Sequence, residues 1–98
     1  MSDIFNAANQ KIATMGEDNK VRNIQGQVIG SVLNNGEVWN INRKIGHVDG
    51  FGRVFEAGAP AGSVHNDGTV YDYDNYPVGK VKDGHIHEGG AALLLLVR

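Results

Sequence analysis

The stretch GEVWNINRKIGHV, residues 36–48, decides the fold, because its pattern recurs along the chain at a nearly fixed interval of 16 residues. The stretch opens on Gly36-x-Val38 and closes on Gly46-x-Val48. The pattern fills five units: 20–32, 36–48, 52–64, 68–81 and 84–97. The glycines that mark them include Gly36, Gly46, Gly52, Gly62, Gly68, Gly79 and Gly84. Such self-similarity is typical of a protein built by repeating one supersecondary unit.

Each unit predicts a β-hairpin. Pairs such as Val38-Trp39 favour strands, and the Asn-Gly and Asp-Gly pairs between units favour tight turns with positive φ. Ile45 and Val48 stand three residues apart around a glycine, and a bulge there would bring both to one face and curve the sheet. We therefore predict a mainly β fold, with five hairpin repeats of about 16 residues closing around an axis as one continuous meander.

The residues before the repeats predict a helix instead. Ile4, Phe5, Ala8, Ile12 and Met15 follow helical spacing, and Gly16 suits a helix end. We expect residues 1–18 to form an N-terminal helix and leader, and residues 19–98 to form the five-hairpin domain.

The repeated pattern GxVxxxxxxxIGxV over residues 20–97 resembles the small bacterial β-flower proteins, a family of unknown function. The resemblance implies four or five β-hairpin petals around a central axis and carries no catalytic residue to transfer. Lys20 and Leu95 stand where the family pattern has glycine, which makes the end units irregular.

Composition limits the function classes. A chain of 98 residues forms one domain, and its net charge of −2 gives no electrostatic footprint for nucleic acid. The longest apolar run, residues 91–97, is too short to span a bilayer, and there is no cysteine. We expect a cytoplasmic, non-enzymatic protein without a cofactor, bound neither to a membrane nor to nucleic acid.

One repeat position gathers planar side chains: Trp39, Phe55, Tyr71 and His87, with Arg22 in the first unit. Packing between neighbouring hairpins explains these residues, and we favour that interpretation. The alternative is a stacking belt for a planar or sugar ligand.

His85 and His87 have the one ligand-like spacing in the chain, because alternate residues of a strand share a face. Two imidazoles on one face could grip a divalent ion, although no third ligand is identifiable. Both histidines also occupy ordinary repeat positions, so we expect no stoichiometric metal.

The last predicted strand, residues 91–97, is apolar on both faces and must be covered by another element or by a second subunit. The leading hypothesis is therefore a structural or protein-interaction domain that forms a homo-oligomer; any other protein partner is unknown. The alternative is a small-ligand or metal-binding protein that uses the aromatic belt or the His85/His87 pair.

Overall fold

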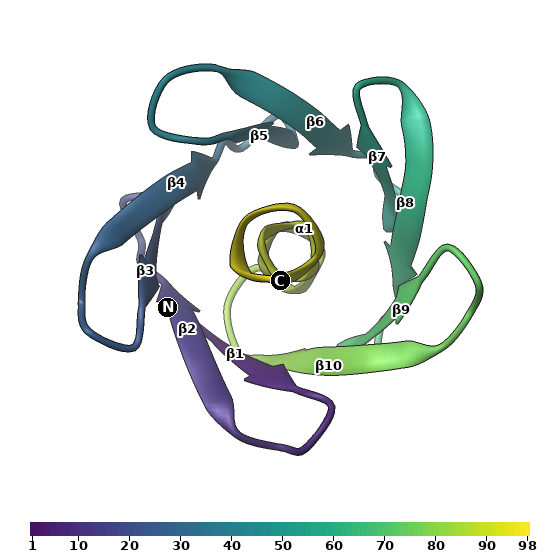
Figure 1. The fold of residues 1–98 in the computed structure, drawn as a ribbon, viewed down its shortest axis with the longest axis horizontal. Coiled ribbons are helices and arrows are strands. Elements are labelled where there is room, and N and C mark those ends of the chain that lie inside the picture. Colours follow the sequence, from purple (N-terminus) through teal and green to yellow (C-terminus); the bar gives the residue numbers. More distant parts are fainter.

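The computed structural model describes residues 1–98 as a closed barrel of ten antiparallel strands around a short C-terminal helix (Figure 1). The strands are β1 (Ser2–Asn6), β2 (Lys11–Met15), β3 (Lys20–Asn23), β4 (Val28–Val32), β5 (Glu37–Trp39), β6 (Lys44–Val48), β7 (Arg53–Glu56), β8 (Ala59–Val64), β9 (Thr69–Asp72) and β10 (Pro77–Lys82). Helix α1 (Ile86–Ala92) continues into the π-helical turn η1 (Leu93–Val97). The prediction of a mainly β, closed meander is confirmed.

Each strand pairs with its neighbours in the chain, and β1 pairs with β10 to close the ring. The hairpins radiate outward from the axis, so that their tips lie at the rim of a disc of 30 × 29 × 19 Å (Figure 1). Closure satisfies the strand edges and leaves none exposed for edge-to-edge pairing.

The predicted N-terminal helix is wrong, because residues 2–15 form the hairpin β1–β2. The segment Asp3-Ile4-Phe5-Asn6 matches Glu37-Val38-Trp39-Asn40, and Lys11-Ile12-Ala13-x-Met15 matches Lys44-Ile45-Gly46-x-Val48. This hairpin carries Ala13 where the other second strands carry glycine, which hid it from the glycine pattern. A spacing that fits a helix therefore belongs to the first hairpin of the ring.

The predicted bulge occurs in every hairpin. In β3–β4, Val21 faces Gly30 and Arg22 faces Val28, so Ile29 is the extra residue. The equivalent extra residues in the five hairpins are Ile12, Ile29, Ile45, Ala61 and Val78. All five pack against the core. A flat strand would point these side chains outward, and the bulge turns them inward.

The inner wall is made of cross-strand pairs between neighbouring hairpins. The pairs are Ile4–Val81, Met15–Val21, Val32–Val38, Val48–Val54 and Val64–Val70, and all ten side chains are buried. Burying each contributes roughly 1.5–3 kcal/mol, which makes this layer the main source of stability.

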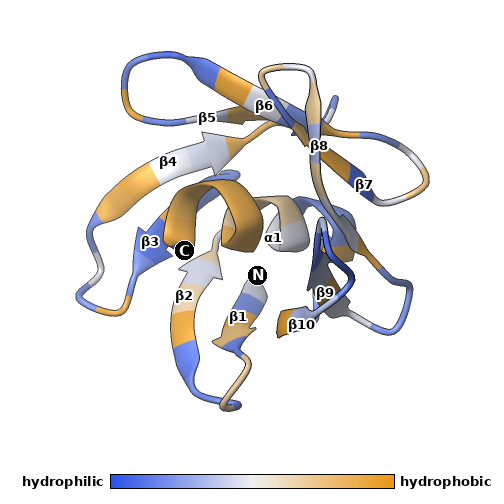
Figure 2. Cartoon of the chain, turned by 45° about the vertical axis from the view of Figure 1, so that its right-hand side comes forward, coloured by the Kyte–Doolittle hydropathy of each residue, from blue (hydrophilic) through white to orange (hydrophobic).

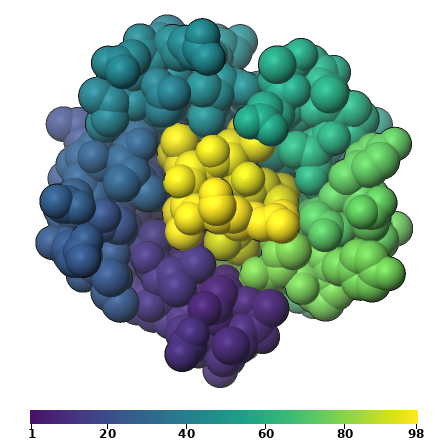
Figure 3. Space-filling view, in the orientation of Figure 1, coloured from purple at the N-terminus to yellow at the C-terminus, as the bar shows by residue number.

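Residues 84–97 are not a fifth hairpin, which corrects the prediction for this unit. The chain leaves β10, enters the barrel and runs along its axis as α1 and η1 (Figures 1 and 3). Gly89 and Gly90 lie against Val81 and Val64, where a Cβ at either glycine would clash with the valine methyl groups. Small residues thus let the helix pass through the valine layer, and the apolar run that we assigned to a strand fills the barrel.

Candidate functional site

A continuous set of partly buried apolar residues lies at the end of the barrel where the chain terminates. We define the barrel mouth as the five bulge residues Ile12, Ile29, Ile45, Ala61 and Val78 together with Leu94, Leu95, Leu96 and Val97. All nine are only partly buried. The C-terminal residues occupy the centre of this face (Figure 3), and Figure 2 shows the strongly apolar colour of the last helical turn.

The leucines of the mouth are held by the repeat glycines. Contacts of their methyl groups place Leu93 against Gly79, Leu94 against Gly62, Leu95 against Gly46 and Leu96 against Gly30. Each successive leucine along the helix therefore contacts the hairpin that precedes, in the chain, the one contacted by the leucine before it. The Arg98 N–H donates a hydrogen bond of 3.2 Å to the Leu93 carbonyl, which is the i→i+5 pattern of a π-helix. One such turn holds about as many residues as the ring has hairpins, so each leucine can contact a different hairpin.

Three of the four planar side chains lie on the outer surface of the hairpins. Trp39, Phe55 and Tyr71 are half-buried on the outside of the barrel, opposite the buried valines. Phe55 stacks on His47 of the neighbouring hairpin at 4.8 Å, and Tyr71 lies 4.4 Å from His65. These contacts are the ones that packing between hairpins requires.

His87 does not share that position, because it lies on α1 rather than on a strand. Phe5 of β1 takes its place, paired with Lys80 as Phe55 is paired with His47. The Lys82 ammonium lies 5.2 Å from the centre of the Phe5 ring. The Ile4-Phe5-Asn6 triplet was the signal that could have identified this residue from the sequence.

The strand geometry assumed for the histidine pair is also wrong. His85 is the exposed residue before α1 and His87 lies in its first turn. Residues two apart on a helix do not face each other. His87 borders a small hollow with Glu88 and Asp49, but neither these three nor any other group of three or more His, Asp or Glu side chains is placed so that it could hold a metal ion.

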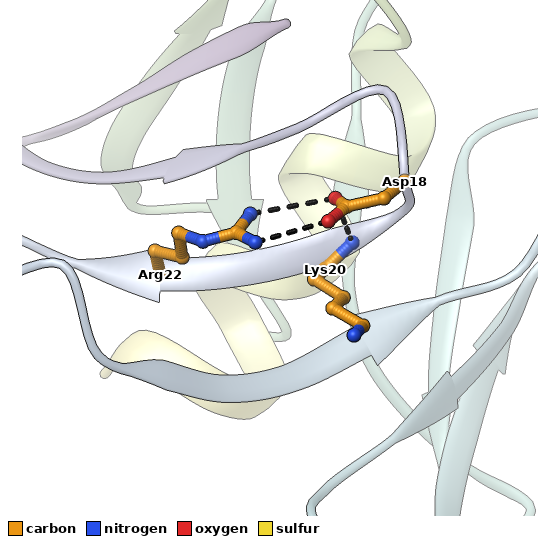
Figure 4. A network of polar contacts seen from close by, with 3 residues as sticks. All are labelled: Asp18, Lys20 and Arg22. Carbon is orange, nitrogen blue, oxygen red and sulfur yellow. Dashed lines mark hydrogen bonds and ion pairs between the residues drawn. The ribbon is translucent and has the colours of Figure 1, made fainter.

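Asx side chains organise the turns. Asp18 accepts a hydrogen bond of 3.1 Å from the Lys20 backbone N–H, and its carboxylate pairs with both terminal nitrogens of Arg22 at 3.0 and 3.4 Å (Figure 4). The Arg22 hydrogen bond is the largest cause that lowers the pKa of Asp18 to about 2. The backbone N–H of Thr69 likewise lowers the pKa of Asp67.

Hollows open between neighbouring hairpins. The largest, about 490 Å³, lies between β6 and β7 and is lined by Arg43, Lys44, Ile45, Gly46, His47, Glu56, Ala57 and Gly58. Smaller ones lie between β2 and β3, between β7 and β9, and between β1 and β10. We call the largest the β6–β7 groove.

The fold and its surfaces define a class of protein: a closed antiparallel meander of hairpins, filled by its own C-terminal helix. Neither helix has the length and apolarity that a membrane crossing requires. No protein-family profile matches the chain, and neither a curated protein nor a solved structure shows significant similarity to it.

Proposed function

We propose that this chain is a non-enzymatic, cytoplasmic protein-interaction domain that self-associates through the barrel mouth. The observation that carries the proposal is the gathering of partly exposed Leu94, Leu95, Leu96 and Val97 inside a ring of apolar bulge residues. Contiguous apolar surface of this kind on a small protein marks an interaction site.

A second copy of the chain is the occupant that the shape favours. The mouth lies on the broad face of the disc, which measures 30 × 29 Å, so a second disc can lie flat against it. Near-circular symmetry also lets two such faces meet in an isologous dimer. The nine mouth residues carry no charge that would oppose their contact.

The architecture also supports the resemblance to the β-flower proteins as a proposal about family. Hairpins around an axis are what that resemblance implies, and the barrel has them. Membership of the family, a five-fold repeat in its sense and a bacterial origin remain predictions. A small-ligand or metal-binding role for the aromatic belt or for His85 and His87 remains the alternative, and the pairing of the rings with neighbouring hairpins weighs against the belt.

Sedimentation velocity over a range of protein concentrations tests the proposal. We expect the unaltered chain to sediment as a dimer, and Val97→Glu to sediment as a monomer with an unchanged circular-dichroism spectrum. Ile29→Gln, which puts an uncharged polar group at a partly buried mouth residue, is the milder variant if Val97→Glu fails to fold.

Phe51→Glu is the matched control, because it adds the same charge at an 82% exposed apolar residue outside the mouth. It should leave the mass unchanged. A monomer for the unaltered chain at every concentration would refute the proposal. A ligand retained in the native mass spectrum would instead favour the binding-protein alternative.

A further inference from the structure

The two hairpins that flank the β6–β7 groove differ from the other three at their tips. In β1–β2, β3–β4 and β9–β10 the first strand ends in Asn6, Asn23 or Asp72, whose Oδ1 accepts the N–H groups two and four residues later. In β5–β6 the Asn40 side chain instead accepts from Asn42 and Arg43. In β7–β8 a glutamate, Glu56, stands there and the turn shortens to Ala57-Gly58.

Ala57 is held in a strained conformation. Its φ of 51° lies in the left-handed region, whereas the other non-glycine residues with positive φ are all Asn or Asp, which tolerate it. Its N–H crosses to the neighbouring hairpin and donates to the Ile45 carbonyl at 3.1 Å. The two-residue turn between Glu56 and Ala59 enforces this conformation, because both central residues of such a tight hairpin turn take positive φ.

One wall of the groove is formed by small residues, and the other wall carries positively charged side chains. Ala57 and Gly58 leave space where three of the other four tips carry a large side chain, namely Ile24, Ile41 and Tyr73, whereas the β1–β2 tip carries Ala7. Its volume of about 490 Å³ falls within the range of about 300–1,000 Å³ of small-molecule pockets. The opposite wall presents the cations Arg43 and Lys44 together with the His47 ring, which stacks on Phe55.

Arg43 makes no ion pair, and neither do Lys20, Lys80, Lys82 and Arg98, but of these five cations Arg43 is the one that lines the groove. Arg22 and Arg53 are paired with Asp18 and Asp49 at 3.0 and 2.7 Å, whereas Arg43 makes no ion pair. Lys44 reaches Glu37 only at 3.7 Å. Glu56 is the one carboxylate that lines the groove, so positive groups outnumber it there although the chain as a whole carries a charge of −2.

We propose that the β6–β7 groove binds a small organic anion. Its phosphate or carboxylate group lies against Arg43 and Lys44, because a guanidinium matches the two oxygens of such a group. Its body, the size of a monosaccharide, lies over Ala57 and Gly58, where larger side chains would leave no space. This inference is independent of the barrel mouth and stands whether or not the protein self-associates.

Chemical shifts of backbone amides test the proposal on the full ¹⁵N-labelled chain. Glucose 6-phosphate, inorganic phosphate, citrate and glucose are each added to millimolar concentration. We expect saturable shifts at Gly46, Ala57 and Gly58 with glucose 6-phosphate or with citrate, and none with glucose. The stronger of the two anions identifies phosphate or carboxylate as the preferred group. If inorganic phosphate binds as tightly as glucose 6-phosphate, the sugar contributes nothing to affinity. That result would overturn the proposal that the body of the ligand contacts Ala57 and Gly58.

Arg43→Gln should weaken binding at least tenfold, and Lys20→Gln is the matched control, because it removes one positive charge from an exposed residue outside the groove. Gly58→Asn narrows the groove with a residue that tolerates the φ of 85° and should also weaken binding while the spectrum stays folded. Equal weakening by Arg43→Gln and Lys20→Gln, equal shifts with glucose, or no shift with any anion would refute the proposal.

Discussion

Leu95 lies directly against Gly46: its Cδ1 is 2.8 Å from the point that a Cβ on Gly46 would occupy, and the carbonyl oxygen of Phe55 crowds the same point. The helix in the centre and the wall of the barrel therefore meet without room for one further methyl group. The same relationship joins Leu93, Leu94 and Leu96 to Gly79, Gly62 and Gly30. An α-helix with 3.6 residues per turn would advance each leucine by about 100°, whereas hairpins in a ring of five stand about 72° apart. The wider π-helical turn brings successive leucines closer to successive hairpins.

Gly46→Ala should destabilise the protein by about 1–3 kcal/mol, the usual cost of overpacking. The added Cβ meets the backbone of Phe55, which cannot move without disturbing the pairing of β6 with β7. Gly50→Ala is the matched control, since a Cβ there has no neighbour within 4 Å. Urea unfolding measures both, and an equal midpoint for the two variants would contradict the close fit.

Leu93→Ala should lower the free energy of unfolding by about 2–5 kcal/mol, because Leu93 is 1% exposed and its removal leaves a cavity. Deletion of residues 85–98 should abolish cooperative unfolding altogether, since the barrel would lose the helix that fills it. Differential scanning calorimetry distinguishes the outcomes. A truncated chain that melts cooperatively near the original temperature would show that the ring of strands is stable without the helix.

Ser2→Ala should leave the stability unchanged or raise it by about 1 kcal/mol. The Ser2 hydroxyl is buried without a hydrogen-bond partner, and an unsatisfied buried hydroxyl costs free energy that a methyl group does not. Thermal unfolding of the two proteins measures the difference. A clear loss of stability would show that the hydroxyl has a partner in solution.

The Asp18–Arg22 pair should make stability fall at acid pH. The pKa of Asp18 is lowered from 3.8 to about 2 in the folded protein, so its contribution is present above pH of about 4 and is lost as the pH falls towards 2. The pair is exposed to solvent, so the effect is small and screened by salt. Unfolding curves between pH 2 and 6 should show the Asp18→Asn variant converging with the unaltered protein as the pH falls.

Arg22→Gln provides the companion experiment, because it removes the largest cause of the shift and leaves the carboxylate in place. The pKa of Asp18, followed by NMR, should rise towards its ordinary value in this variant. A pKa that stays near 2 would show that the Lys20 N–H alone holds the carboxylate ionised.

Local pattern was enough to predict the hairpins between residues 20 and 82 and the bulges in their second strands. Gly36 shows why: its φ is 92°, and a side chain there would meet the Val48 carbonyl, so the position requires glycine whatever surrounds the hairpin. The groove could not be predicted, because Arg43 and Ala57 belong to different units and only the pairing of β6 with β7 brings them together.

The sequence by itself determined a chain of antiparallel hairpins bent at regular intervals, because turn glycines, alternating valines and bulges act over a few residues. The tertiary structure alone decided which segments complete the ring. Ile4, Phe5 and Met15 fit a helix and a hairpin equally well by spacing, and the free edges of β3 and β10 select the hairpin. The run from Ala91 to Val97 fits a buried strand equally well, but a closed ring has no edge left to accept it. The interior of the ring has two layers: a valine layer, where only small residues fit, and a layer of wall glycines, where leucine side chains fit. A helix along the axis places its glycines and alanines in the first layer and its leucines in the second.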